Sequence, residues 1–159
     1  MSLHTEPVRA ARGSPRHTAA RDLMSESLTA VLDGVRVLVV EDEALVAMDL
    51  EYLLEDRGAV VVGTCVSNAD AAACLKAKDV DAVLLDYNLV DGEAEPTLEL
   101  ARDMDIAVVI HSGHAIGNVL RQTYPDLDVL AKPALPGSIA DALRTAVRRS
   151  GPANDLASS

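Results

Sequence analysis

The sequence of 159 residues has no phenylalanine, no tryptophan and only three tyrosines. A hydrophobic content of 49% is still ample for a core, which must then be built from aliphatic side chains. No apolar run approaches the roughly 20 residues that a membrane-spanning helix needs. The N-terminal residues 1–17 carry arginines but no apolar stretch, so they do not form a secretory signal. These absences predict a cytoplasmic protein that does not bind a membrane.

Cysteine is also scarce, with Cys65 and Cys74 as the only two. They do not have the spacing of a metal-binding knuckle. In a cytoplasmic chain, two such thiols are expected to be reduced and buried.

Basic residues are outnumbered, with 14 Lys and Arg against 25 Asp and Glu, and the net charge is −11. Charges balance within residues 1–34, so the acidity lies almost wholly in residues 35–149. Contact with phosphate backbones needs a basic face, and we therefore expect no nucleic-acid binding. An acidic cluster instead suits a divalent cation or a basic partner surface.

Between residues 35 and 149, short apolar runs alternate with helical patterns such as Leu45, Met48 and Tyr52. Strands are expected at 35–40, 59–66, 81–86, 106–112 and 128–131. Helices are expected at 44–58, 68–79, 93–104, 115–124 and 137–149. Five strands that each lead into a helix predict an α/β fold, a doubly wound parallel sheet with helices on both faces. If the strand order is 2-1-3-4-5, the first and third strands meet at the switch point where ligands bind.

The two ends of the chain differ from this central domain of residues 35–149. Residues 1–34 are expected to be a disordered extension that contains a short amphipathic helix at 22–33. Residues 150–159 are expected to be a disordered tail. Neither end is long enough to suggest an output domain.

Acidic side chains follow two of the expected strands. Glu41 and Asp42 end the first strand, and Asp86 ends the third. Singly, each would be read as a loop or helix cap favoured by the helix dipole. Together at neighbouring strand ends they would repel one another unless a cation intervenes, and carboxylate oxygens suit Mg²⁺.

The fourth and fifth strands end in Ser112 and Lys132. Alone, each would be an ordinary turn hydroxyl or exposed loop lysine. At the same sheet edge as the carboxylates, they could stabilise a phosphoryl group, while an aspartate can act as the nucleophile toward phosphorus.

The segments VLVVEDE (37–43), AVLLDYNLVDG (82–92), VVIHSG (108–113) and AKPA (131–134) together resemble the receiver domain of two-component response regulators. The resemblance covers about residues 35–149 and implies a flavodoxin-like fold. It implies that Asp86 is the phosphoacceptor and that Mg²⁺ is the cofactor. The implied metal ligands are Asp42, Asp86, the backbone carbonyl of Asn88 and, through water, Glu41. Ser112 takes the place of the switch hydroxyl, Lys132 that of the phosphate-binding lysine, and the bond before Pro133 is expected to be cis.

Some positions depart from the family's pattern. Val129 stands where receivers usually carry an aromatic ring, and Ala134 stands where phenylalanine is usual after Lys-Pro. Asn88 and His114 are candidate modulators of the phosphoryl group, although His114 is also consistent with a plain loop histidine. The residue pattern of segment 84–101 further resembles that of receivers phosphorylated by HWE-type histidine kinases.

The resulting interpretation is a phosphoryl-accepting receiver that acts in a phosphorelay without a DNA-binding output domain. It is not an enzyme beyond its own phosphorylation and dephosphorylation. The expected partners are a histidine kinase or histidine phosphotransfer protein and a downstream protein target, with a homodimer as a candidate assembly. Two alternatives remain: a hydrolase that forms an aspartyl phosphate, and a pseudo-receiver that binds partners without being phosphorylated.

Overall fold

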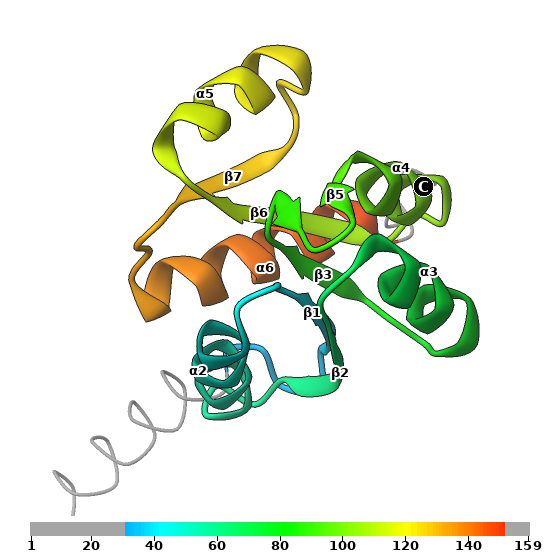
Figure 1. Ribbon diagram of the computed structural model, residues 1–159. Helices are drawn as coiled ribbons and strands as arrows, with labels where there is room; N and C mark the ends of the chain where they lie inside the picture. The colour runs from blue at the N-terminus through cyan, green and yellow to red at the C-terminus, as the bar shows by residue number, and fades with distance from the viewer. Residues whose placement is uncertain (1–30, 152–159) are drawn as a thin grey trace, which may run out of the picture.

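The structure, a computed structural model, describes residues 31–151 (Figure 1). The expected helix at 22–33 therefore lies almost wholly outside the described residues, as do the segment 1–21 and residues 152–159 of the tail. None of the helices between residues 31 and 151 is long and apolar enough to cross a membrane.

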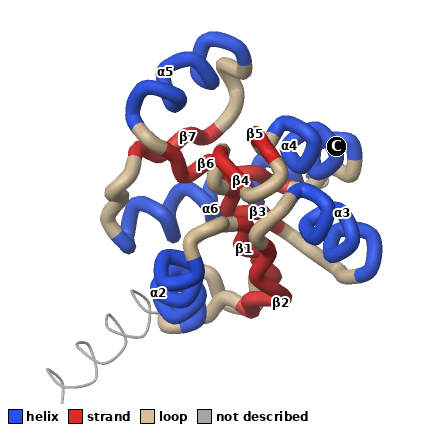
Figure 2. Tube along the Cα trace, viewed as in Figure 1, coloured by secondary structure: helices blue, strands red, loops and turns tan. Residues whose placement is uncertain are grey.

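Five parallel strands form one sheet at the centre of the molecule (Figure 2). They are β1 (Arg36–Val40), β2 (Val60–Cys65), β3 (Ala82–Leu85), β6 (Ala107–Ser112) and β7 (Asp128–Ala131). Their order is β2-β1-β3-β6-β7, which confirms the expected order 2-1-3-4-5. β1 and β3 are therefore neighbours, with Val40 in register with Leu85 at their carboxyl ends.

Helices cover both faces of the sheet (Figure 1). They are α2 (Ala44–Glu55), α3 (Asn68–Ala77), α4 (Glu95–Asp103), α5 (His114–Thr123) and α6 (Pro136–Ser150). On one face, α2 and α6 bury aliphatic side chains such as Leu54 and Leu143. On the other face, α3, α4 and α5 do so with Leu75, Leu98 and Leu120. Both layers are aliphatic apart from Tyr87, Tyr124 and the two cysteines, in keeping with the scarcity of aromatic residues.

Leu32 belongs to this core although it precedes the first strand. It is fully buried, and its N–H donates to the carbonyl of Arg57 at 2.9 Å. Residues 31–34 form a turn rather than the end of a regular helix. The packed body thus includes residues that the sequence analysis assigned to the N-terminal extension.

Two local features differ from the sequence-based expectation. In α2 the side chains of Leu45, Met48 and Tyr52 are 72%, 64% and 75% exposed, so the stripe that predicted the helix does not face the core. The chain after β3 also forms a small antiparallel hairpin, β4 (Asn88–Leu89) and β5 (Gly92–Glu93), and the helix expected from residue 93 begins only at Glu95. Two-residue strands leave no periodic signal in a sequence.

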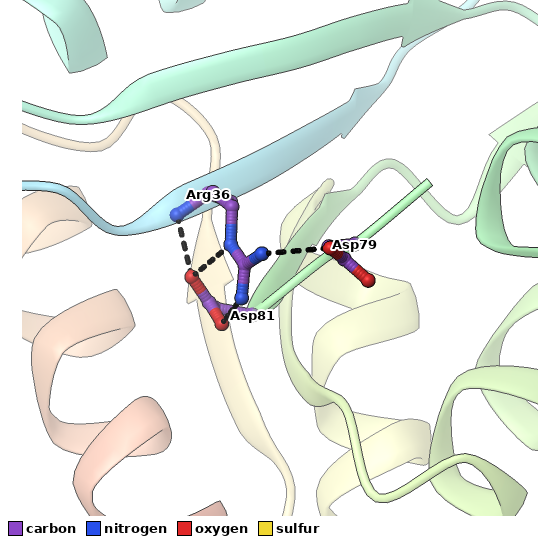
Figure 3. A network of polar contacts seen from close by, with 3 residues as sticks. All are labelled: Arg36, Asp79 and Asp81. Carbon is purple, nitrogen blue, oxygen red and sulfur yellow. Dashed lines mark hydrogen bonds and ion pairs between the residues drawn. The ribbon is translucent and has the colours of Figure 1, made fainter. Parts of the chain in front are cut away.

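Figure 3 shows an ion-pair network between the starts of β1 and β3. Arg36 is the first residue of β1 and Asp81 directly precedes β3, so the network lies opposite the acidic strand ends. Arg36 donates from its backbone N–H and its guanidinium to the carboxylate of Asp81, at 2.8 to 3.1 Å. The guanidinium also lies 3.2 Å from Asp79. Its hydrogen bond to Asp81 lowers the pKa of that carboxyl group.

Candidate functional site

The chemically active side chains lie where four neighbouring strands end. Backbone hydrogen bonds extend the sheet beyond the strands: Asp86 N–H donates to the carbonyl of Val40 at 2.8 Å, and Lys132 N–H to that of Ser112 at 2.8 Å. The carboxyl ends of parallel strands share one edge, so their next residues are held close together. The sheet therefore fixes Glu41, Asp86, Ser112 and Lys132 at one place.

Three carboxylates form a cluster at this edge. One oxygen each from Glu41, Asp42 and Asp86 can be chosen so that all lie within 4.8 Å of one another. Glu41 and Asp86 are buried, at 2% and 7% exposure, whereas Asp42 is exposed. The hard oxygen donors, with one side open to solvent, fit Mg²⁺, which keeps several waters when it binds to proteins.

Lys132 pairs with both buried acids. Its Nζ lies 2.9 Å from Glu41 Oε2 and 3.2 Å from Asp86 Oδ2. Glu41 Oε1 also accepts a hydrogen bond from the N–H of Glu43 at 3.3 Å. The sequence analysis placed Glu41 near the metal and Lys132 near the phosphate, and it did not foresee that the two side chains pair with each other.

The charges of the site shift the pKa values of its members. Burial raises the pKa of Glu41, with the nearby Asp86 acting in the same direction, and the hydrogen bond from Lys132 opposes this only in part. Burial disfavours the charged form of Lys132, but its hydrogen bond to Glu41 and the charge of Asp86 outweigh this and raise its pKa. A cation beside the carboxylates would relieve the repulsion between Glu41 and Asp86.

Ser112 is fully buried, and its Oγ has no hydrogen-bond partner among the described residues. A buried hydroxyl is normally paired, because an unpaired one costs desolvation free energy. This orphaned donor sits at the end of β6, beside the strand end that carries Asp86, and fits an incoming anionic oxygen. The Lys132–Pro133 bond is cis, as expected for this segment.

The other candidate residues lie around this centre. Asn88 is exposed, and its N–H donates to Asp86 Oδ1 at 3.4 Å. His114 is exposed at the start of α5. His111 is 6% exposed, with neither ring nitrogen paired among residues 31–151. Burial lowers the pKa of His111, and the charge of Lys132 adds to this effect.

The sequence analysis missed the residues that hold the loop after Asp86. The carboxylate of Asp91 accepts hydrogen bonds from the N–H groups of Asn68 and Ala69, at 2.8 and 3.1 Å. The amide of Asn68 in turn donates to the carbonyl of Glu93 at 2.9 Å. These contacts join segments more than 20 residues apart in sequence, and no local motif marks them.

Comparison with known proteins agrees with this geometry. The family model described as "Response regulator receiver domain" matches residues 37–144. SdrG from Sphingomonas melonis has a similar solution structure, with a TM-score of 0.63 and 34% identity over 72% of this chain and 97% of that one. A response regulator receiver protein from Sinorhizobium medicae has a TM-score of 0.66 at 28% identity, over 75% of this chain and 98% of that one. The phyllosphere-induced regulator PhyR of Methylorubrum extorquens is 25% identical over 132 residues, 81% of this chain and 47% of PhyR.

A doubly wound sheet whose carboxyl edge carries three acids, a hydroxyl and a lysine is consistent with the phosphoacceptor site of a signalling domain. The chain belongs to the response regulator receiver family of two-component signalling. Receivers are typically non-enzymatic modules that pair with histidine kinases, and the cluster of Glu41, Asp42 and Asp86 is typical of their Mg²⁺ site. The chain spans about half the length of the curated relatives it matches.

Proposed function

We propose that this protein accepts a phosphoryl group on Asp86 with Mg²⁺ as cofactor. The observation that carries the proposal is the approach of Lys132 to the buried Asp86 carboxylate, 3.2 Å away, inside the cluster with Glu41 and Asp42. Asp86 is buried, pairs with the Lys132 ammonium and lies next to the exposed Asp42. These are the surroundings of a nucleophile rather than those of a surface acid.

In the proposed reaction, an oxygen of Asp86 attacks the phosphorus of a phosphohistidine. The new O–P bond forms as the N–P bond breaks, and the donor histidine retains the electron pair of the broken bond. Lys132 would shift from the two carboxylates toward the phosphoryl oxygens, and the buried hydroxyl of Ser112 would donate to another oxygen. Asp42, Asp86 and the carbonyl of Asn88 would hold Mg²⁺, with Glu41 acting through water. The ion would supply positive charge to the transferring oxygens.

The two alternatives are less well supported. A hydrolase that turns over an aspartyl phosphate usually carries a second acid two residues after the nucleophile, and Asn88 occupies that position. An amide cannot serve as a general acid. A pseudo-receiver has no need of a lysine paired to two buried acids, an arrangement that costs desolvation free energy.

The proposed donor is a histidine kinase, of the HWE type by loop resemblance, or a histidine phosphotransfer protein. The proposed output is contact with a protein target in the cytoplasm rather than with DNA. The net charge of −11 opposes binding to nucleic acid. SdrG and the Sinorhizobium medicae receiver protein are matched over 97% and 98% of their solved chains, whereas PhyR is matched over 47% of its length.

We further propose that a short helix lies within residues 22–30, leads into the turn at 31–34 and packs against the receiver. Leu32 anchors the segment beside the end of α2, whose apolar stripe of Leu45, Met48 and Tyr52 is exposed. Truncation should stop at residue 30, because removing Leu32 would open the core. Loss of residues 1–30 should lower the melting temperature of a monomer, and a change from dimer to monomer would instead place the contact between two copies. No change in either property would refute the packing.

The test of the phosphoacceptor is intact mass after incubation with acetyl phosphate and Mg²⁺. The protein should gain one phosphoryl group, and Asp86→Asn should gain none. Asp49→Asn, which alters an exposed acid on α2, is the control and should still be labelled. Equal labelling of the native protein and Asp86→Asn would refute the assignment.

A further inference from the structure

The two cysteines belong to different secondary-structure elements, but their side chains are in contact. Cys65 is the last residue of β2, and Cys74 lies on α3. Their sulfur atoms are 3.4 Å apart. A disulfide has an S–S bond of about 2.05 Å, so the two atoms need to approach by only ~1.4 Å more.

The two thiols differ in their surroundings. Cys65 is 4% exposed, whereas Cys74 is half-buried and accessible from solvent. The thiol of Cys65 donates its hydrogen to the sulfur of Cys74. Burial, together with this contact, raises the pKa of Cys65 to about 12. Cys65 therefore keeps its proton and Cys74 is the sulfur that can react first.

Lys78 and Cys74 both border Gly63 of β2. A Cβ placed on Gly63 would lie 3.5 Å from Lys78 Nζ and 3.8 Å from Cys74 Sγ, so the glycine leaves room for both groups on the same side of β2. Lys78 is held there by donating to the carbonyl of Val62 at 2.6 Å. A positive charge on this side of the strand would stabilise the anionic oxygen that leaves when Cys74 is oxidised.

We propose that Cys65 and Cys74 are a modification site, at which hydrogen peroxide or a similar two-electron oxidant forms an intramolecular disulfide. In the first step, the thiolate of Cys74 attacks a peroxide oxygen, the O–O bond breaks, and the departing hydroxide takes a proton to leave as water. This leaves Cys74 as a sulfenic acid. In the second step, the sulfur of Cys65 attacks the sulfur of Cys74, the S–O bond breaks, and the Cys65 proton leaves with the hydroxyl as water. Two thiols are oxidised and one peroxide is reduced to two waters.

The disulfide would restrain the backbone at Cys65 and Val66, which is hydrogen-bonded both to Glu41 and to the loop after Asp86. The carbonyl of Cys65 accepts a hydrogen bond from the N–H of Glu41 at 2.9 Å. The carbonyl of Val66 accepts one from Val90 at 3.2 Å, on the loop that follows Asp86. A cross-link from β2 to α3 would therefore restrain the backbone that supports the acidic cluster. The inference stands on the cysteine geometry and does not depend on phosphorylation.

The experiment treats the full, reduced chain with hydrogen peroxide and follows free thiols and intact mass. The free thiols should fall from two to none, the mass should fall by two hydrogens, and digestion should yield one peptide pair joined through Cys65 and Cys74. Retention of both thiols, or gain of oxygen at Cys74 while Cys65 stays free, would overturn the proposal. So would a product linked between two chains.

Variants separate the roles of the two sulfurs and of the lysine. Cys65→Ala should trap Cys74 as a sulfenic acid that a dimedone probe captures, whereas Cys74→Ser should leave Cys65 unreacted. Lys78→Met should slow disulfide formation severalfold, and Lys76→Met, an exposed lysine on the same helix, should not. Capture at Cys65 in place of Cys74, or equal rates in the two lysine variants, would contradict the proposed order of reaction.

Discussion

Lys132 Nζ stands 3.2 Å from the carboxylate of Asp86, and the same nitrogen lies 2.9 Å from Glu41. Two acids that would repel each other are thus held together by one ammonium that reaches them from the end of another strand. Lys132 therefore contributes both to the stability of the sheet edge and to the proposed reaction. If a phosphoryl oxygen takes over the contact with Lys132, the negative charges of Glu41 and Asp86 must be balanced by another positive charge.

Replacing Lys132 by alanine should lower the free energy of unfolding by about 3 kcal/mol in the absence of Mg²⁺. This is the lower end of the cost of removing one partner from a buried ion pair, because Lys132 itself is 29% exposed. Urea unfolding measures the change, with Lys76→Ala as a control that removes an exposed lysine. A loss no larger than that of the control would mean that the ion pair contributes nothing to folding.

Replacing Asp42 by alanine should weaken Mg²⁺ binding by about tenfold or more, since even outer-shell partners of a metal site typically contribute that much. Asp42 is the exposed member of the cluster, so its removal should leave the core intact. Calorimetric titration measures the affinity, and Asp49→Ala on the exposed side of α2 is the control. An unchanged affinity would place the ion away from these strand ends.

His111 should make the protein less stable as the pH falls below about 6.5. Burial lowers the pKa of His111 in the folded state, so below that pH the unfolded chain binds a proton that the folded chain does not. Between about pH 7.5 and about pH 5.5, this should remove up to about 1.4 kcal/mol from the free energy of unfolding. His111→Leu should lack that part of the pH dependence, and His114→Asn, a change at an exposed histidine, should retain it. Identical pH profiles for His111→Leu and the native protein would contradict a buried, neutral imidazole.

Activation should be transmitted by movement of the segment from Gly113 to Tyr124, because no aromatic ring is present at position 129 to change its orientation. Val129 is 9% exposed and stiff, and a Cβ on Gly117 would lie 3.3 Å from Val129 Cγ1, so this part of α5 rests closely on β7. Beryllofluoride, a mimic of the aspartyl phosphate, should shift the amide resonances across 113–124. The shifts should be lost in Ser112→Ala. Changes limited to the neighbours of Asp86 would rule out this route.

The sequence allowed the sheet order and the acidic cluster to be predicted for the same reason. Alternating strands and helices dictate parallel pairing, and parallel pairing gathers the strand ends that carry Glu41, Asp86, Ser112 and Lys132. Periodicity failed for α2, because a helix with apolar residues on two sides does not reveal which side meets the sheet. Leu50 and Leu54 face the core, while Leu45 and Met48 do not.

The contacts between particular pairs of side chains could not be predicted from the sequence either. The hydrogen bond from Lys132 to Glu41 and the contact of Cys65 with Cys74 depend on how α3 and the last strand end are positioned by packing. The spacing of these residues along the chain predicts neither the hydrogen bond nor the cysteine contact. The fold had to be known before these pairs could be found.

The central claim is that Asp86 itself receives the phosphoryl group, and chemical trapping tests it most directly. After phosphorylation with acetyl phosphate and Mg²⁺, borohydride reduces an aspartyl phosphate to homoserine, which peptide mass spectrometry locates. Homoserine at position 86, absent when Mg²⁺ is withheld, is the expected result. Homoserine at Asp42 or another acid, or phosphate retained on a serine or histidine with Asp86 unchanged, would contradict the account.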